Sequence, residues 1–179
     1  KADTTNKYPA PTLDNLHIPA LPELVMRNVP GMIEGEKMKV VRASNGTVQN
    51  QDMSSFENTL DYWAHASQLW WLGGKPGDEL DLEFEAPANG DFQVYGYFTK
   101  AIDYGLSIIA INGQPAENTV DLYAPAVKAS GPVDLGVFPI HTGINTMKIT
   151  ITGTNPDAFP KRYMFGLDGI VLKPQQETK

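Results

Sequence analysis

The chain has 179 residues, a formal net charge of −7 and 41% hydrophobic residues, which is enough for one domain with a hydrophobic core. The acidic balance, without a cluster of Lys and Arg, argues against binding to nucleic acid or anionic lipid. Because the chain has no cysteine, disulfides, thiolate metal sites and cysteine nucleophiles are excluded. No apolar run approaches the roughly 20 residues that cross a bilayer, so we expect no membrane-spanning segment.

Residues 1–30 differ in composition from the rest of the chain. They are rich in proline and show no regular hydrophobic period. Proline fixes φ and biases the preceding residue toward extended conformations. We therefore predict an extended N-terminal arm or linker over residues 1–30 and a β-sandwich domain over residues 31–175.

From Met32 onward, short apolar runs alternate with turn signals. The run "ELDLEFEA" (79–86) has the period of 2 that is typical of a half-buried strand. It predicts buried apolar residues at Leu80, Leu82 and Phe84, and exposed acids at Glu79, Asp81 and Glu83. Further strands are predicted over residues 37–43, 92–98, 106–111, 133–140, 145–153 and 163–172.

Three Asn-Gly pairs separate these runs, at residues 45–46, 89–90 and 112–113. Asn-Gly is the strongest short-range signal for a two-residue β-hairpin. Residues 53–66 are the one candidate for helix, and a loop with a single helical turn is the better interpretation. The pattern predicts an all-β, antiparallel sandwich or barrel, with helix under about a tenth of the residues against a usual third.

The sequence contains no pattern typical of a catalytic site. No Gly-x-Ser-x-Gly segment is present, and His17, His65 and His141 do not match a Ser-His-Asp arrangement. The acids of residues 79–85 share one strand face, whereas a glycosidase needs two carboxylates that oppose each other across a cleft. We therefore predict no catalytic residues and expect a protein that is not an enzyme.

Glu34, Glu36 and Asp168 are candidate metal ligands. Glu34 and Glu36 lie two residues apart, so in a strand they share a face. Asp168 lies in the last predicted strand, and the first and last strands of a sandwich are often neighbours. The three carboxylates can thus form one oxygen site of the kind that calcium prefers; the alternative is that they are ordinary surface acids.

Adjacent residues on a strand point to opposite faces, so Trp70 and Trp71 are expected to divide between the core and the outside. We predict that Trp70 is in the core and that Trp71 faces outward, because Gly73-Gly74 leaves an open surface beside it. Leu69 has the opposite effect, since its burial would bring Trp71 inward. An outward ring can stack on a sugar, or it can be covered by the proline-rich arm.

Five segments in order, "IEGE", "GDELDLEFEAPANGDFQVYGYF", "AINGQP", "HTGINTMKITITG" and "GLDGIVLKP", resemble the carbohydrate-binding modules of families 6 and 35 over residues 31–174. The resemblance implies a jelly-roll β-sandwich of the galactose-binding-domain type. It implies non-catalytic binding of a poly- or oligosaccharide, beside a glycoside-active domain or subunit of a bacterial protein that is secreted, periplasmic or on the cell surface. It also implies a structural calcium at Glu34, Glu36 and Asp168.

These modules often carry an asparagine for the sugar just before the "LD" of the last strand, where this chain has Gly166. We therefore place the sugar contacts elsewhere, with aromatic and acidic candidates at Trp63, Trp71, Tyr104, Tyr123, Asp103 and Asp121. The predicted function is a carbohydrate-binding module. The alternatives are a structural module that docks a neighbouring glycoside-active domain or subunit, and a glycoside hydrolase.

Overall fold

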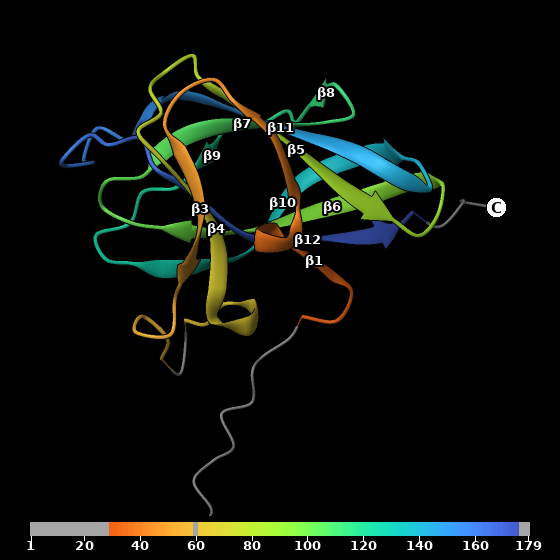
Figure 1. Cartoon of the computed structure of the whole chain (residues 1–179), viewed down its shortest axis with the longest axis horizontal. Helices are drawn as coiled ribbons and strands as arrows, with labels where there is room; N and C mark the ends of the chain where they lie inside the picture. Colours follow the sequence, from red (N-terminus) through yellow and green to blue (C-terminus); the bar gives the residue numbers. More distant parts are fainter. Residues whose placement is uncertain (1–28, 59–60, 176–179) are drawn as a thin grey trace, which may run out of the picture.

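The computed structural model describes residues 29–58 and 61–175, which form two antiparallel β-sheets (Figure 1). The order of the first sheet is β10 (Lys128–Ile140), β6 (Gly90–Lys100), β12 (Phe165–Pro174), β4 (Ser67–Leu72) and β3 (Thr47–Asp52), with β1 (Met32–Glu34) paired to β12. The order of the second sheet is β2 (Lys39–Ala43), β5 (Glu79–Ala86), β11 (Gly143–Thr154), β7 (Gly105–Ile111) and β8 (Gln114–Pro115), with β9 (Val120–Asp121) paired to β7. The prediction of an all-β, antiparallel sandwich is confirmed.

Helix is confined to two short 3-10 turns in the described part of the chain, η2 (Gly35–Lys37) and η3 (Ala64–Ala66). The second turn falls inside residues 53–66, where a loop with one helical turn was predicted. Within residues 29–58 and 61–175, no helix has the length and apolar character needed to cross a bilayer. The predicted arm lies almost wholly in residues 1–28, outside the described residues.

The alternating run of β5 places its apolar side chains in the core between the sheets. Leu80 and Leu82 are fully buried and Phe84 is 4% exposed, and all three pack in one cluster with side chains of the opposite sheet, including Phe165 and Ile170. The predicted register is therefore confirmed. A slip of one residue would have placed the acids of this strand in that core.

Glu79, Asp81 and Glu83 of β5 are only partly exposed, which differs from the prediction. The neighbouring strand β2 carries basic side chains opposite them. Lys39 Nζ lies 2.8 Å from Glu83 Oε2, and Arg42 contacts Glu79 and Asp81 at 2.7 and 2.9 Å. These ion pairs cover the outer face of β5. The acidic side chains therefore point to the predicted face but are less exposed than predicted.

Only one of the three Asn-Gly pairs forms the predicted hairpin. Asn112-Gly113 joins β7 to β8, which pair directly through Ile111 and Gln114. The other two pairs, at 45–46 and 89–90, connect strands that belong to different sheets. The hairpin prediction is wrong at these two places, because a short turn with Asn-Gly can also carry the chain from one sheet to the other.

The prediction for the tryptophan pair is wrong. Trp71 is 1% exposed and its Nε1 donates to the carbonyl oxygen of Asn45 at 2.8 Å, whereas Trp70 is half-buried. The space expected beside Gly74 is filled, since a Cβ there would lie 2.5 Å from Ile151 Cδ1 and 3.1 Å from Trp71 Cζ2. The glycine makes room for the buried ring of Trp71 and does not leave a surface open.

Candidate functional site

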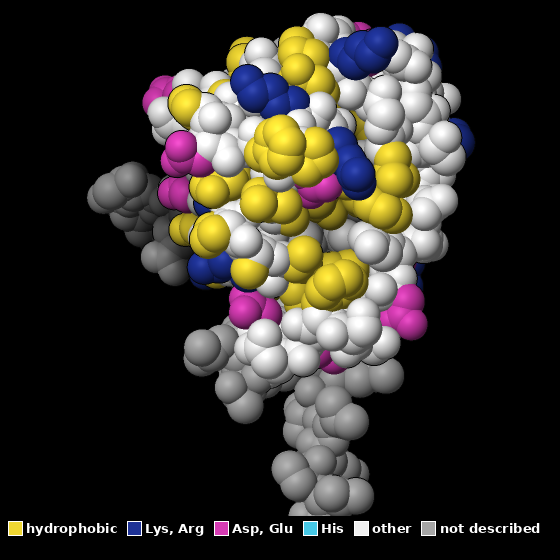
Figure 2. Space-filling view, turned by 90° about the vertical axis from the view of Figure 1, so that its left-hand side faces the viewer, with side chains coloured by type: hydrophobic (Ala, Val, Ile, Leu, Met, Phe, Trp, Pro, Cys, Tyr) yellow, Lys and Arg dark blue, Asp and Glu magenta, His cyan; other side chains and the backbone are white. Residues whose placement is uncertain are grey.

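A pocket of about 200 Å³ opens at one end of the sandwich. We call it the end pocket and define it by six of its lining residues, namely Gln51, Phe56, Trp70, Asp103, Tyr104 and Arg162. They come from β3, the loop after β3, β4, the turn between β6 and β7, and the segment before β12. Figure 2 faces the side from which the loop of residues 155–163 projects, and it shows hydrophobic side chains gathered around neighbouring basic and acidic ones.

The turn between β6 and β7 is held from two sides. Ala101 bridges to Tyr123, and Tyr104 bridges to Met164. The Phe159 N–H also donates to the Ile102 carbonyl at 3.0 Å. Segments that are distant in the sequence therefore position Asp103 in the pocket wall.

The pocket contains one loose ion pair. Arg162 Nη1 lies 3.7 Å from Asp103 Oδ2, and the side chains are 60% and 17% exposed. This distance is longer than a hydrogen bond, so the guanidinium keeps its N–H donors available to a ligand. Arg162 was missed in the sequence, since a basic residue in a loop carries no local signal of what it faces.

Behind the pocket lies a buried polar network. Trp63 Nε1 donates to Thr99 Oγ1 at 2.7 Å, and the Thr99 hydroxyl donates to Gln68 Oε1. Gln68 Nε2 donates to Gln51 Oε1 at 2.6 Å and to the Tyr104 hydroxyl at 3.4 Å. Burial raises the pKa of Tyr104 above its ordinary value. A satisfied buried network of this kind fixes one arrangement of the side chains that support the pocket.

The structure separates the predicted sugar-binding residues. Trp63 and Trp71 are each 1% exposed, so neither ring offers a face to a ligand, and their prediction as a platform is wrong. Asp103 and Tyr104 do line the end pocket, although Tyr104 is 5% exposed. The ring that the sequence assigned to the core, Trp70, lines the pocket instead.

Asp121 and Tyr123 lie outside the end pocket. Asp121 Oδ1 accepts from the Tyr123 N–H at 2.9 Å, and its Oδ2 accepts from Asn155 Nδ2 at 2.6 Å. These bonds tie β9 to the loop that follows β11. Asp121 and Tyr123 thus stabilise segments close to the pocket, but their side chains do not line it.

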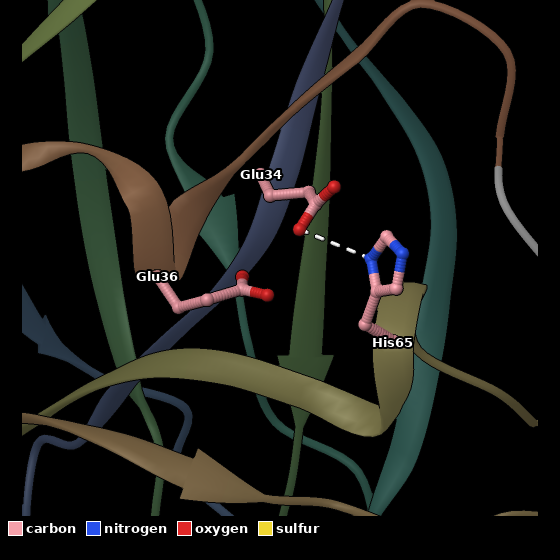
Figure 3. Close-up of side chains that lie close together, drawn as sticks. All are labelled: Glu34, Glu36 and His65. Carbon is pink, nitrogen blue, oxygen red and sulfur yellow. Dashed lines mark ion pairs between the residues drawn. The ribbon is translucent and has the colours of Figure 1, made fainter.

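A second group of polar side chains gathers where β1 meets β12. The pairing of Glu34 with Gly169 confirms that the first and last strands are neighbours. One ligand atom each from Glu34, Glu36 and His65 lie within 4.8 Å of one another (Figure 3), so this cluster can hold a metal ion. Asp168 is not within that cluster but lies beside it, and we call these four residues the acidic corner.

Like charges perturb the carboxyl groups of the acidic corner. Burial raises the pKa of Asp168 to about 7, and the carboxylates of Glu36 and Glu34 add to the shift, although the Ala64 N–H donates to its Oδ1 at 2.8 Å. Burial, with Glu34 adding, also raises the pKa of Glu36. In Glu34 the effect of burial is outweighed by Lys37, Glu36 and His65, which leave its pKa lowered. Such a set of carboxyl groups fits a divalent cation.

The predicted metal ligands are therefore brought together in part, and His65 was missed. In the sequence, His65 lies in a predicted loop, and its distance along the chain from Glu34 and Glu36 matches no metal-binding motif. It reaches Glu34 because η3 turns back toward β1, with φ of 51° at His65 and at Ala66. Positive φ in two successive residues other than glycine is uncommon and is not readable from local sequence.

No protein-family model and no curated protein matches this chain. Among solved structures, a Paenibacillus xanthan lyase matches with a TM-score of 0.67 and 15% identity, over 84% of this chain and 14% of its own. A Paenibacillus cycloisomaltooligosaccharide glucanotransferase, complexed with cycloisomaltoheptaose, matches with a TM-score of 0.53 and 12% identity, over 82% of this chain and 19% of its own. The Podospora anserina GH26-CBM35 β-(1,4)-mannanase matches with a TM-score of 0.50 and 13% identity, over 83% and 28%.

This chain thus spans between 14% and 28% of the length of those three proteins. Their likeness shows a shared β-sandwich fold, and it confirms the resemblance to carbohydrate-binding modules at the level of the fold. Because one fold hosts many functions, the function has to be argued from the end pocket and the acidic corner.

Proposed function

We propose that this domain is a non-catalytic carbohydrate-binding module of an exported protein, and that it binds a sugar unit in the end pocket. The observation that carries the proposal is the combination of the indole of Trp70 with the Asp103–Arg162 pair in one pocket. Sugars present apolar C–H faces to aromatic rings and hydroxyl groups to polar side chains. The amide of Gln51 and the carboxylate of Asp103 supply acceptors, and Arg162 supplies donors.

The pocket chemistry supports binding more than hydrolysis. Glycoside hydrolysis usually employs two carboxyl groups that oppose each other across the scissile bond. Among the described residues that line the end pocket, the partner of Asp103 is the guanidinium of Arg162. We propose that the sugar is held here while another domain or subunit supplies any reaction.

A divalent metal ion belongs to the same proposal, with calcium as the ion that the sequence resemblance implies. Glu34, Glu36 and Asp168 are the carboxylates that would hold it, and the ion would neutralise their mutual repulsion at the junction of β1 with β12. A cation bound only by the folded state adds RT ln(1 + [L]/Kd) to the free energy of unfolding, where [L] is the concentration of free ion. Its proposed role is to hold this junction and not to contact the sugar.

A glycan array, followed by calorimetric titration with the best glycan, tests the proposal. Trp70→Ala and Arg162→Ala should each weaken binding by about fivefold or more with the fold retained. Tyr95→Ala on β6 and Lys161→Ala beside Arg162 are matched controls, because neither side chain lines the pocket, and both should bind like the parent. Equal binding by all four variants would place the sugar elsewhere.

One observation favours a second candidate, a module that docks a neighbouring protein domain. Three hydrophobic side chains are exposed at the pocket end of the sandwich, with Phe159 at 76%, Ile102 at 43% and Phe56 at 38%. Exposed apolar groups that lie together are typical of interaction surfaces. Phe159→Ser separates the two candidates, since it should weaken docking to a partner domain and leave the affinity for a free oligosaccharide unchanged.

A further inference from the structure

We propose that His65 is a nitrogen ligand of the ion at the acidic corner, and that the corner therefore binds a borderline transition-metal ion such as Zn²⁺ more tightly than calcium. This inference deepens the metal part of the proposed function and is independent of the sugar in the end pocket. It rests on the position of one imidazole beside two carboxylates, those of Glu34 and Glu36.

The three donor groups converge from separate elements. Glu34 ends β1, Glu36 lies in η2, and His65 lies in η3, and Figure 3 shows their polar atoms directed toward a common space. His65 Nδ1 lies 3.1 Å from Glu34 Oε2. Two ligand atoms about 2 Å from a tetrahedral ion lie roughly 3.3 Å from each other, so this pair needs little movement to share one.

The carboxylate oxygens of the acidic corner are only partly paired with hydrogen-bond donors. Glu36 Oε2 is shielded from solvent and has no hydrogen-bond donor. Asp168 is 5% exposed, and its Oδ1 accepts from the backbone N–H of Ala64 at 2.8 Å. A buried carboxylate without compensation is costly, so both groups point to a cation between the strands.

The ammonium group of Lys37 partly neutralises the negative charge of the corner from the surface. Its Nζ lies 2.8 Å from Glu34 Oε2, but its side chain is 66% exposed. An exposed ion pair contributes little to stability, and the long lysine side chain can turn into solvent. An arriving metal ion can therefore replace the ammonium on Glu34 without disturbing the core.

The imidazole decides which ion is preferred. Calcium takes oxygen ligands almost exclusively, so a nitrogen at the site adds little to its binding. Zinc is bound by imidazole nitrogen as well as by carboxylate oxygen, and imidazole suits zinc, copper and nickel in general. Glu34, Glu36 and His65 supply three such ligands, and Asp168 lies beside them.

The backbone holds His65 in this position. His65 has φ of 51° and ψ of 25°, and the Ala66 N–H donates to the Trp63 carbonyl at 3.1 Å. The Ala64 N–H reaches Asp168 in the same turn. The turn that presents the imidazole to Glu34 is thereby tied to the last strand through Asp168.

The test is calorimetric titration of metal-free protein with Zn²⁺ and, separately, with Ca²⁺. The key variant is His65→Asn, because asparagine tolerates positive φ and replaces the nitrogen ligand with an oxygen that calcium can use. We expect the parent to bind Zn²⁺ at least tenfold more tightly than Ca²⁺. His65→Asn should lower the Zn²⁺ affinity at least tenfold and leave the Ca²⁺ affinity within about twofold. Glu36→Gln should lower both.

His17 and His141 are the other histidines of the chain, so a His17→Asn, His141→Asn double variant controls for zinc bound elsewhere and should match the parent. As a direct readout, Co²⁺ in place of Zn²⁺ should give visible absorption bands that change in His65→Asn. Unchanged Zn²⁺ affinity in His65→Asn, or tighter binding of Ca²⁺ than Zn²⁺ by the parent, would overturn the inference and leave a calcium site standing. Binding of neither ion would overturn the metal part of the proposed function as well, whereas the sugar titration decides the end pocket separately.

Discussion

The end pocket and the acidic corner both use residues of the first sheet, but they arrange charge in opposite ways. In the pocket, Asp103 and Arg162 carry opposite charges, lie 3.7 Å apart and reach solvent. In the corner, Glu34, Glu36 and Asp168 carry like charges, and burial with mutual repulsion raises the pKa of Asp168 to about 7. The pocket is thus electrically balanced and free to exchange partners, whereas the negative charge of the corner is only partly offset by Lys37. The difference teaches that the charges of the pocket are already paired, whereas those of the corner can hold a metal ion.

The largest expected effect tests which tryptophan belongs to the core and which to the pocket. Trp71→Ala should lower the free energy of unfolding by about 3–5 kcal/mol, because it removes a fully buried ring and leaves a cavity. Trp70→Ala should cost clearly less, since that ring is half-buried. Chemical denaturation of both variants measures the difference. Equal losses would mean that Trp70 is also a core residue and would remove the pocket's aromatic wall.

Removal of metal tests the corner. Saturation of a native-state site at a hundredfold excess over Kd adds about 2.7 kcal/mol of stability, so chelator should lower the melting temperature of the parent measurably. In Glu36→Gln the melting temperature should no longer respond to chelator, while Trp70→Ala should respond like the parent. If chelator leaves the parent unchanged, the corner does not depend on a cation, and the contrast with the pocket fails.

Removal of the Trp70 ring is expected to weaken glycan binding and to leave the metal affinity unchanged. Trp70→Ala should weaken glycan binding by about 1–3 kcal/mol, by analogy with other aromatic stacking platforms. The affinity of the corner for its ion should stay the same, because Trp70 takes no part in the cluster of Glu34, Glu36 and His65. Calorimetry with glycan and metal ion in turn checks both statements, and a coupled loss would show that the two regions form one site.

The smallest expected effect concerns the ion pair of the pocket. Asp103→Asn should change the free energy of unfolding by less than about 1 kcal/mol, since exposed ion pairs contribute little. Glycan affinity should nevertheless fall, because the variant disturbs both an acceptor and the position of Arg162. Lys39→Ala removes an ion pair of similar exposure on β2 and is the control; it should leave glycan binding unchanged. A strong loss of stability in Asp103→Asn would assign the pair to the fold instead of the pocket.

Sequence patterns predicted most of the fold and only part of the two candidate regions. The alternation in β5 correctly assigned Leu80, Leu82 and Phe84 to the core, because strand geometry imposes a period of 2 wherever one face is buried. The prediction that Glu34 lies near the last strand also held, through the pairing of β1 with β12. The Asn-Gly pairs were less informative, because the same dipeptide fits a hairpin and a crossing between sheets.

The sequence by itself determined the class of fold and the faces of the strands, since both depend on local spacing. Only the tertiary structure decided which tryptophan lines the pocket, because the burial of Trp71 depends on Gly74 and Ile151, which lie beyond its own strand. The same holds for Arg162 beside Asp103 and for His65 beside Glu34. These partners are brought together by loops and by positive φ, and short-range periodicity carries no information about either.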